Sequence, residues 1–183
     1  KKANNAKLLL DYGFALAANP HARLRVPISL DDDSLLERKR RVLNRNRAPH
    51  FAFLTLSLDS PLTLPANFSA LTLLRVAAAD EAALEQFERV DDDTCGPHHV
   101  FGDVHALGRL VDELERMAVC DDGKRDKDAM VECRRALDGD DLPHCQRRRV
   151  ARTLFALRYR TTRADILRAS LAFVRDALDE ARQ

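Results

Sequence analysis

Residues 103–118 read DVHALGRLVDELERMA, and this stretch shows the clearest amphipathic pattern in the chain. Its apolar side chains recur every three or four positions, which places them on one face of a helix. They are Val104, Leu107, Val111, Leu114 and Ala118. Asp103 stands directly before the first of them, where an acidic side chain commonly caps a helix. The stretch therefore predicts a helix that packs one face against a core.

Helical spacing recurs through most of the chain on either side of this stretch. Ser34 and Glu37 have the spacing of a capping box, in which each side chain bonds to the backbone N–H of the other residue. Pro65 suits the first turn of another helix, and Asp80 is placed to cap the next one. Residues 121–142 are polar and predict at most one short helix.

The C-terminal part predicts two further helices. Apolar residues at helical spacing mark the first between Val150 and Leu157, and the second between Leu167 and Leu178. Thr162 lies between the two stripes, and we interpret it as the cap that separates the helices.

Two segments predict β-strands. Residues 24–30 alternate apolar and polar side chains, and Pro27 confines this strand to a sheet edge because proline has no N–H to donate. Residues 51–58 are the second candidate. The fold class predicted from these patterns is mainly α, a helical bundle entered from a small β segment.

The composition limits the class of protein. The chain has 183 residues, a formal net charge of +1 and 45% hydrophobic residues, enough to bury the core of one domain or somewhat more. No apolar run approaches the roughly 20 residues of a membrane-spanning helix, and we expect no signal peptide and no membrane partner. The near-neutral charge argues against nucleic acid as the main partner.

The cysteines are few and form no Cys-x-x-Cys pair, so we expect free thiols, a reducing intracellular compartment and no metal site. They are Cys95, Cys120, Cys133 and Cys145. A zinc site is the alternative, because His98 and His99 follow Cys95 closely and His144 precedes Cys145. The spacing does not match the ligand patterns that zinc sites usually show.

Runs of like charge allow two interpretations. Residues 38–47 hold a dense basic cluster, and residues 147–149 are three consecutive arginines. Such clusters attract phosphate or an acidic partner, but a solvated helix face is the interpretation we favour for a nearly neutral chain. The aspartate runs at 31–33 and 91–93 lack the spacing of a calcium loop, so we interpret them as caps and polar loops.

The start of the chain resembles a known family. Residues 4–14 read NNAKLLLDYGF, and Asn-Pro-His follows at 19–21. This arrangement resembles the C-terminal edge of the SET domain in protein-lysine methyltransferases of the Rubisco large-subunit methyltransferase-like class. That family typically has Ser-Asn-Ala-Glu-Leu before Tyr-Gly-Phe, so Asn4 stands for its serine and Lys7 for its glutamate.

The remainder resembles the helical substrate-binding domain that follows the SET domain in these proteins. Residues 74–84 are similar to one of its helices, and residues 163–167 to its last segment. The family's Tyr-Thr-Thr-(Ile/Leu)-Glu motif is absent, and residues 120–133 read differently. The resemblance implies a short SET-domain remnant at 1–22, with one or two β-strands near it, and a multi-helical Rubisco LSMT-type substrate-binding domain at 23–183.

The resemblance also implies site residues. Tyr12 would lie beside the channel of the target lysine and position its amine, and Tyr12, Gly13 and Phe14 would border the S-adenosylmethionine pocket. The family's main catalytic tyrosine and its cofactor-binding Asn-His motif are expected upstream of Lys1. Considered without the family, Tyr12 and Phe14 are better interpreted as core aromatics that end a helix.

The function implied by the resemblance is the substrate-binding portion of an S-adenosylmethionine-dependent protein-lysine N-methyltransferase. Its partners would be the protein substrate, through a lysine or less expectedly a histidine, and the remainder of the SET domain. By itself the chain is expected to be inactive and to bind no S-adenosylmethionine measurably, because one wall of a pocket leaves a ligand in water. The alternative is a non-catalytic helical adaptor that binds proteins.

Overall fold

The computed structural model describes residues 3, 5–16, 19–58, 64–89, 96–118, 123–139 and 142–183. Its elements in chain order are α1 (Asn5–Tyr12), β1 (Leu24–Ser29), α2 (Leu36–Arg45), β2 (Phe51–Leu56), α3 (Leu64–Ala78), α4 (Glu81–Arg89), the 3₁₀ helix η1 (Pro97–Gly102), α5 (Val104–Ala118), α6 (Gly123–Asp138) and α7 (His144–Ala181). The fold is therefore mainly α with one small sheet, as predicted. Within the described residues, no helix is both long and apolar enough to cross a membrane.

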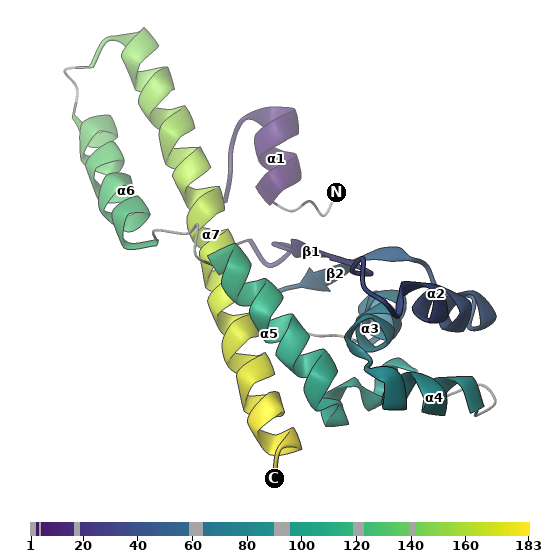
Figure 1. The fold of residues 1–183 in the computed structure, drawn as a ribbon. Helices are drawn as coiled ribbons and strands as arrows, with labels where there is room; N and C mark the ends of the chain where they lie inside the picture. The colour runs from purple at the N-terminus through teal and green to yellow at the C-terminus, as the bar shows by residue number, and fades with distance from the viewer. Residues whose placement is uncertain are drawn as a thin grey trace.

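Helix α3 is the centre of the main body (Figure 1). Residues 70–77 of this helix are all buried, and Leu71, Leu73, Leu74 and Val76 are completely so. A helix with apolar side chains on every face is stable only when other elements cover all of it. The sheet, α2, α5 and η1 all contact α3, and the second half of α7 packs against α5.

The sheet consists of two antiparallel strands, with Val26 opposite Leu54 and Pro27 opposite Phe53. Val26 and Leu54 are buried in the core, whereas the other face exposes aromatic side chains. The carbonyl of Ser29 accepts a hydrogen bond from Arg109 of α5, so it points away from β2. Pro27 lies two residues before Ser29, so its backbone nitrogen also points away from β2. The N–H that proline lacks would therefore lie on the unpaired edge of the sheet. The prediction of an edge strand is confirmed.

The C-terminal part is one continuous helix of 38 residues, α7, so the prediction of two helices separated by a Thr162 cap is wrong. The Thr162 hydroxyl donates to the carbonyl of Arg158, 2.9 Å away in the preceding turn, and Thr161 donates to Leu157 in the same way. Both hydroxyls thus bond within the helix instead of capping a new one. No glycine or proline interrupts residues 144–181.

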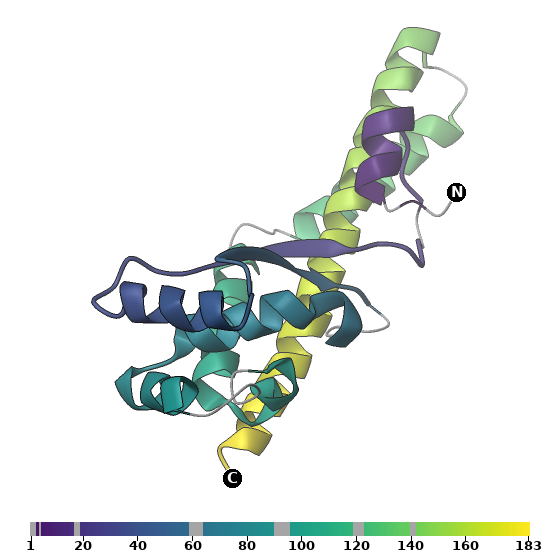
Figure 2. The same ribbon diagram turned by 90° about the vertical axis from the view of Figure 1, so that its right-hand side faces the viewer.

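Helix α6 is longer than the short helix predicted there, and it runs antiparallel to the first half of α7. The two form an arm, here defined as α6 with residues 144–161 of α7, which projects from the main body (Figures 1 and 2). The Asp126 carboxylate of α6 is 4% exposed and lies 2.9 Å from the Arg160 guanidinium of α7. This ion pair connects the two helices near the base of the arm.

Besides Thr162, three caps were predicted, of which two are confirmed and one is wrong. The Asp80 carboxylate accepts from the N–H of Ala83, and the Asp103 carboxylate accepts from the N–H of Ala106. Ser34 does not cap α2, which begins at Leu36 without a side-chain cap. The Asp33 carboxylate accepts from the N–H of Leu35, the residue that directly precedes the helix.

The basic cluster at 38–47 is not simply a solvated helix face, which corrects our preferred interpretation. The Lys39 side chain is 4% exposed, and its ammonium donates to Asp33 at 2.6 Å and to the Ala77 carbonyl at 2.9 Å. Arg38 binds Glu88 of α4 at 2.8 Å, and Arg45 donates to the Glu88 carbonyl. Much of the cluster therefore connects α2 to α3 and α4.

Replacing Asp33 with asparagine is expected to lower the free energy of unfolding by about 1.5 kcal/mol at pH 7, because the buried Lys39 ammonium loses its carboxylate. The hydrogen bond from Lys39 holds the pKa of Asp33 below its usual range. A carboxyl with a lowered folded-state pKa stabilises the fold above its unfolded pKa and loses this effect as the pH falls through the folded value. Urea unfolding of both proteins should therefore show a difference that shrinks between about pH 5 and pH 2. A difference independent of pH would contradict the prediction.

Candidate functional site

The N-terminal segment forms a helix that ends in a sharp turn. Leu8, Leu9 and neighbouring residues make two turns of α1, and Gly13 follows with a φ of +73°. The Gly13 N–H donates to the carbonyl of Leu9 at 3.0 Å, which closes the last turn. Glycine reaches this left-handed conformation without strain, so it terminates the helix here as predicted.

Two asparagines hold this turn in place. Asn5 is 2% exposed, and its side chain accepts from the N–H of Leu16 at 3.0 Å and donates to the Leu16 carbonyl at 2.9 Å. Asn19 donates to the Asn5 carboxamide oxygen at 2.9 Å and to the carbonyl of Ala3 at 3.0 Å. These bonds fasten the start of α1 to the segment after Gly13. We call Asn5 and Asn19 the asparagine clip.

The segment also packs on the first half of α7. The ring of Phe14 meets that of Phe155 edge-on, with centroids 6.4 Å apart. The Arg158 guanidinium lies 5.6 Å from the Phe155 ring centroid and donates to the Ala15 carbonyl at 3.5 Å. Helix α7 therefore supports the turn that carries the predicted site residues.

The same turn presents large apolar side chains to solvent. Leu10 is 84% exposed, Tyr12 68%, Leu16 45% and Phe14 36%. We call these four residues the N-terminal apolar surface. Exposed apolar side chains that lie close together, as the Tyr12 and Phe14 rings do, mark contact sites more often than chance. Tyr12 is thus not a core residue of the described chain, and within it the Tyr12 hydroxyl has no hydrogen-bond partner.

The turn can form one side of a binding site. The rings of Tyr12 and Phe14 lie 6.2 Å apart, and no atom lies within 4 Å of where a Cβ on Gly13 would be. The segment therefore offers a phenol, an aromatic ring and unobstructed backbone next to each other. Lys7 lies on the same helix, where a 2.7 Å ion pair with Asp11 raises the pKa of the ammonium.

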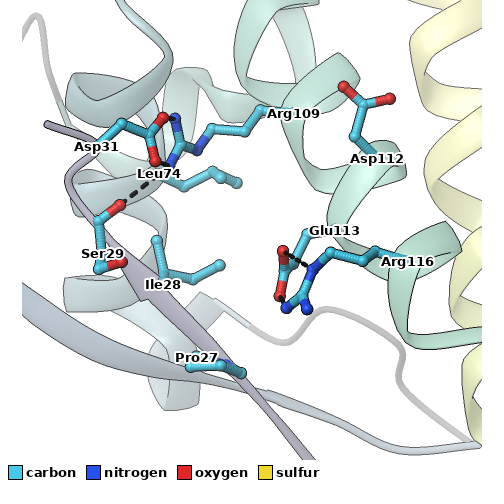
Figure 3. Close-up of a pocket in the computed structure, with 9 residues that line it drawn as sticks. All are labelled: Pro27, Ile28, Ser29, Asp31, Leu74, Arg109, Asp112, Glu113 and Arg116. Carbon is cyan, nitrogen blue, oxygen red and sulfur yellow. Dashed lines mark hydrogen bonds and ion pairs between the residues drawn. The ribbon is translucent and has the colours of Figure 1, made fainter. Parts of the chain in front are cut away.

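Apart from this turn, a hollow of about 400 Å³ lies between β1 and α5 (Figure 3). Ile28 and Leu74 form part of its lining. Arg109 pairs with Asp31, and Arg116 with Glu113, so both guanidinium groups are already neutralised. The hollow contains no histidine, cysteine or lysine among its lining residues. The Arg109–Asp31 pair connects the end of β1 to α5, and the Arg116–Glu113 pair lies within α5.

The metal alternative gains no support from the described part of the chain. No group of three or more His, Cys, Asp or Glu side chains within it has an arrangement that could hold a metal ion. Cys133 and Cys145 are unpaired thiols. Cys95 and Cys120 lie outside the described residues.

Sequence reasoning missed two features. It placed Asn19 in a loop but did not anticipate the asparagine clip, because buried amides look like ordinary turn residues in a sequence. It also missed Arg75, an arginine of α3 that is only 8% exposed. A single arginine within an otherwise uncharged helix was the available signal.

Solved structures with a similar fold include those of the LSMT SET domain and of Rubisco LSMT. The SET domain of LSMT bound to lysine and AdoHcy aligns with a TM-score of 0.59 and 20% identity, over 97% of this chain and 39% of that one. Rubisco LSMT bound to AdoMet aligns with a TM-score of 0.58 and 19% identity, over 97% and 39%. Rubisco LSMT bound to sinefungin and monomethyllysine aligns with a TM-score of 0.59 and 20% identity, over 98% of this chain and 40% of that one. The chain thus has a fold found in SET-domain methyltransferase structures and spans about two fifths of their length.

Sequence comparisons add no assignment. No family model matches the chain, and no curated protein matches it.

Proposed function

We propose that this chain is the substrate-binding portion of an S-adenosylmethionine-dependent protein-lysine N-methyltransferase. In this proposal it docks the protein substrate against the remainder of the SET domain. The observation that carries the proposal is the N-terminal apolar surface, held by the asparagine clip on a fold shared with Rubisco LSMT. An apolar surface of this kind is covered when a partner packs on it, and the SET core is the partner that the shared fold suggests.

Tyr12, Gly13 and Phe14 fit one wall of the cofactor and lysine site. The cofactor supplies the methyl group that is transferred to the amine. The Tyr12 hydroxyl can hydrogen-bond that amine and orient its lone pair, and the apolar rings exclude water from it. The open space beside Gly13 permits close approach of a bound group to the backbone.

A chimera tests the proposed function. Residues 1–183 replace the aligned portion of Rubisco LSMT, and transfer of tritiated methyl groups from S-adenosylmethionine to lysates and to Rubisco is measured. We expect methylated protein with the chimera and none with this chain alone. A variant with Leu10→Asp and Leu16→Asp serves as control, because two carboxylates on the N-terminal apolar surface oppose docking of the core. A chimera that folds and binds S-adenosylmethionine but methylates nothing would instead support the adaptor function.

Changing Tyr12 to phenylalanine in the chimera is expected to lower turnover about tenfold, or to change the number of methyl groups added. The substitution removes one hydrogen bond to the target amine, worth on the order of 1 kcal/mol, and keeps the ring. The melting temperature should stay the same, because the described chain gives the hydroxyl no partner to lose. Steady-state kinetics and a thermal melt on the same variant separate the two effects. Unchanged turnover and product distribution would exclude Tyr12 from the site.

A further inference from the structure

The first part of α7 carries a concentrated positive charge. Residues 144–164 include seven arginines and no aspartate or glutamate. Arg148, Arg149 and Arg152 are three and four residues apart, so they share one face of the helix. Together with His144 and Cys145 they line an open hollow of about 540 Å³ on the arm. We call these three residues the arginine stripe.

The arginine stripe differs from the other arginines nearby. Arg147 donates to the Leu137 carbonyl at 2.7 Å, Arg158 to Ala15, and Arg160 pairs with Asp126. The three stripe residues are exposed, and none of their guanidinium groups has an ion pair or hydrogen bond within the described chain. Like charges three and four residues apart destabilise a helix slightly. The stripe therefore lowers stability without a compensating side-chain contact among the described residues, which is typical of a surface that serves binding.

Geometry and charge favour one kind of ligand. Arg148 and Arg152 are separated by four residues, or about 6 Å along the helix axis. Alternate side chains of an extended peptide are also about 6.6 Å apart and lie on one side of it. Arginine binds carboxylates through two parallel hydrogen bonds, so two acidic residues at alternate positions match the stripe.

We propose that the arginine stripe binds an extended acidic segment of the protein substrate, with aspartate or glutamate at alternate positions. This inference rests on the proposed function, because it assumes that a protein docks on this chain. Nucleic acid is a poorer match. The hollow has no phenylalanine, tyrosine or tryptophan for base stacking among its lining residues, and the whole chain carries a net charge of only +1.

The test measures binding of a fluorescein-labelled octapeptide of alternating glutamate and serine to the full 183-residue chain by fluorescence anisotropy. We expect binding at about 20 mM NaCl that weakens strongly at about 150 mM, where screening between exposed charges is stronger. The variant R148A/R149A/R152A should bind at least tenfold more weakly, which corresponds to about 1.4 kcal/mol. A glutamine–serine peptide should not bind.

The matched control is R168A/R175A/R182A, with two substitutions in the same helix and the third at Arg182, the residue that directly follows it. It removes the same charge from three arginines that are each paired within the chain, to Asp165, Glu115 and Asp179 respectively. This control should change peptide affinity less than twofold, and circular dichroism should show that both variants remain folded.

Three outcomes would overturn the proposal. They are no peptide binding by the wild type at low salt, equal weakening by both triple variants, and tighter binding of a single-stranded oligonucleotide of equal charge. The measurement needs no SET core and no methyl transfer. An inactive chimera with normal peptide binding would therefore refute the proposed function alone, and an active chimera without peptide binding would refute only the arginine stripe.

Discussion

Replacing Arg75 with methionine is expected to lower the free energy of unfolding by about 3 kcal/mol. The buried guanidinium donates to the Asp103 carboxylate at 3.0 Å and to the Gly96 carbonyl at 2.9 Å, and it lies 5.3 Å from the Phe87 ring centroid. It thus connects α3 to α4, η1 and α5. Methionine fills similar space but leaves the Asp103 carboxylate, 18% exposed, without its cation. Loss of one partner from a buried ion pair is strongly destabilising.

Urea unfolding followed by circular dichroism measures this effect. Arg89→Met is the matched control, because Arg89 is an arginine of α4 that is 77% exposed and, among the described residues, pairs with Glu85 alone. Surface ion pairs of that kind contribute little, so the control should change stability by less than about 0.5 kcal/mol. Equal effects of the two substitutions would show that burial of Arg75 has no energetic consequence.

The second large effect is expected at the asparagine clip. Asn5→Leu removes both hydrogen bonds to the Leu16 backbone and the acceptor for the Asn19 amide. A buried polar group left without a partner costs about 1–3 kcal/mol, so we expect α1 to open about a hundredfold more often. Amide hydrogen exchange in α1 should therefore be about a hundredfold faster, while exchange in α3 and α5 stays unchanged.

Asn44→Leu is the control for this substitution, because the Asn44 side chain is exposed and its bond to His50 lies on the surface. It should leave exchange in α1 unaffected. In the chimera, Asn5→Leu should also reduce methyl transfer, because Tyr12 and Phe14 depend on the clip for their position. Normal exchange in α1 would mean that contacts with α7 alone hold the segment.

The sequence was sufficient for features that depend on neighbouring residues. The alternation in 24–30, the cap at Asp103 and the stop at Gly13 are local patterns, and the structure confirms all three. Features that depend on distant residues were not predictable in the same way. Lys39 was expected on a solvated face but is buried, because Asp33 and the Ala77 carbonyl satisfy its ammonium. Burial of Lys39 depends on α3, because the Ala77 carbonyl belongs to that helix.

The candidate site also has a part that was predicted from the sequence and a part that only the structure shows. Tyr12, Gly13 and Phe14 were named from the resemblance, and the structure adds that they form one exposed turn beside α7. Thr162 shows the opposite failure. A threonine between two apolar stripes has the composition of a cap, but its hydroxyl has an equally good acceptor in the preceding turn of the helix. A threonine cap and a threonine inside a helix can be told apart only when the backbone conformation on both sides of it is known.

Because α7 is continuous, its length fixes the distance and the rotation between the groups that it carries. A helix of 38 residues is about 57 Å long, and each residue adds about 1.5 Å and a rotation of about 100°. The distance and angular phase between the arginine stripe, the Tyr12 turn and the main body are therefore fixed by the number of residues between them. Inserting one alanine in the middle of α7 would rotate the arm by more than a quarter turn and change no side chain. The position of the arm therefore depends on the length of this helix as well as on its side chains.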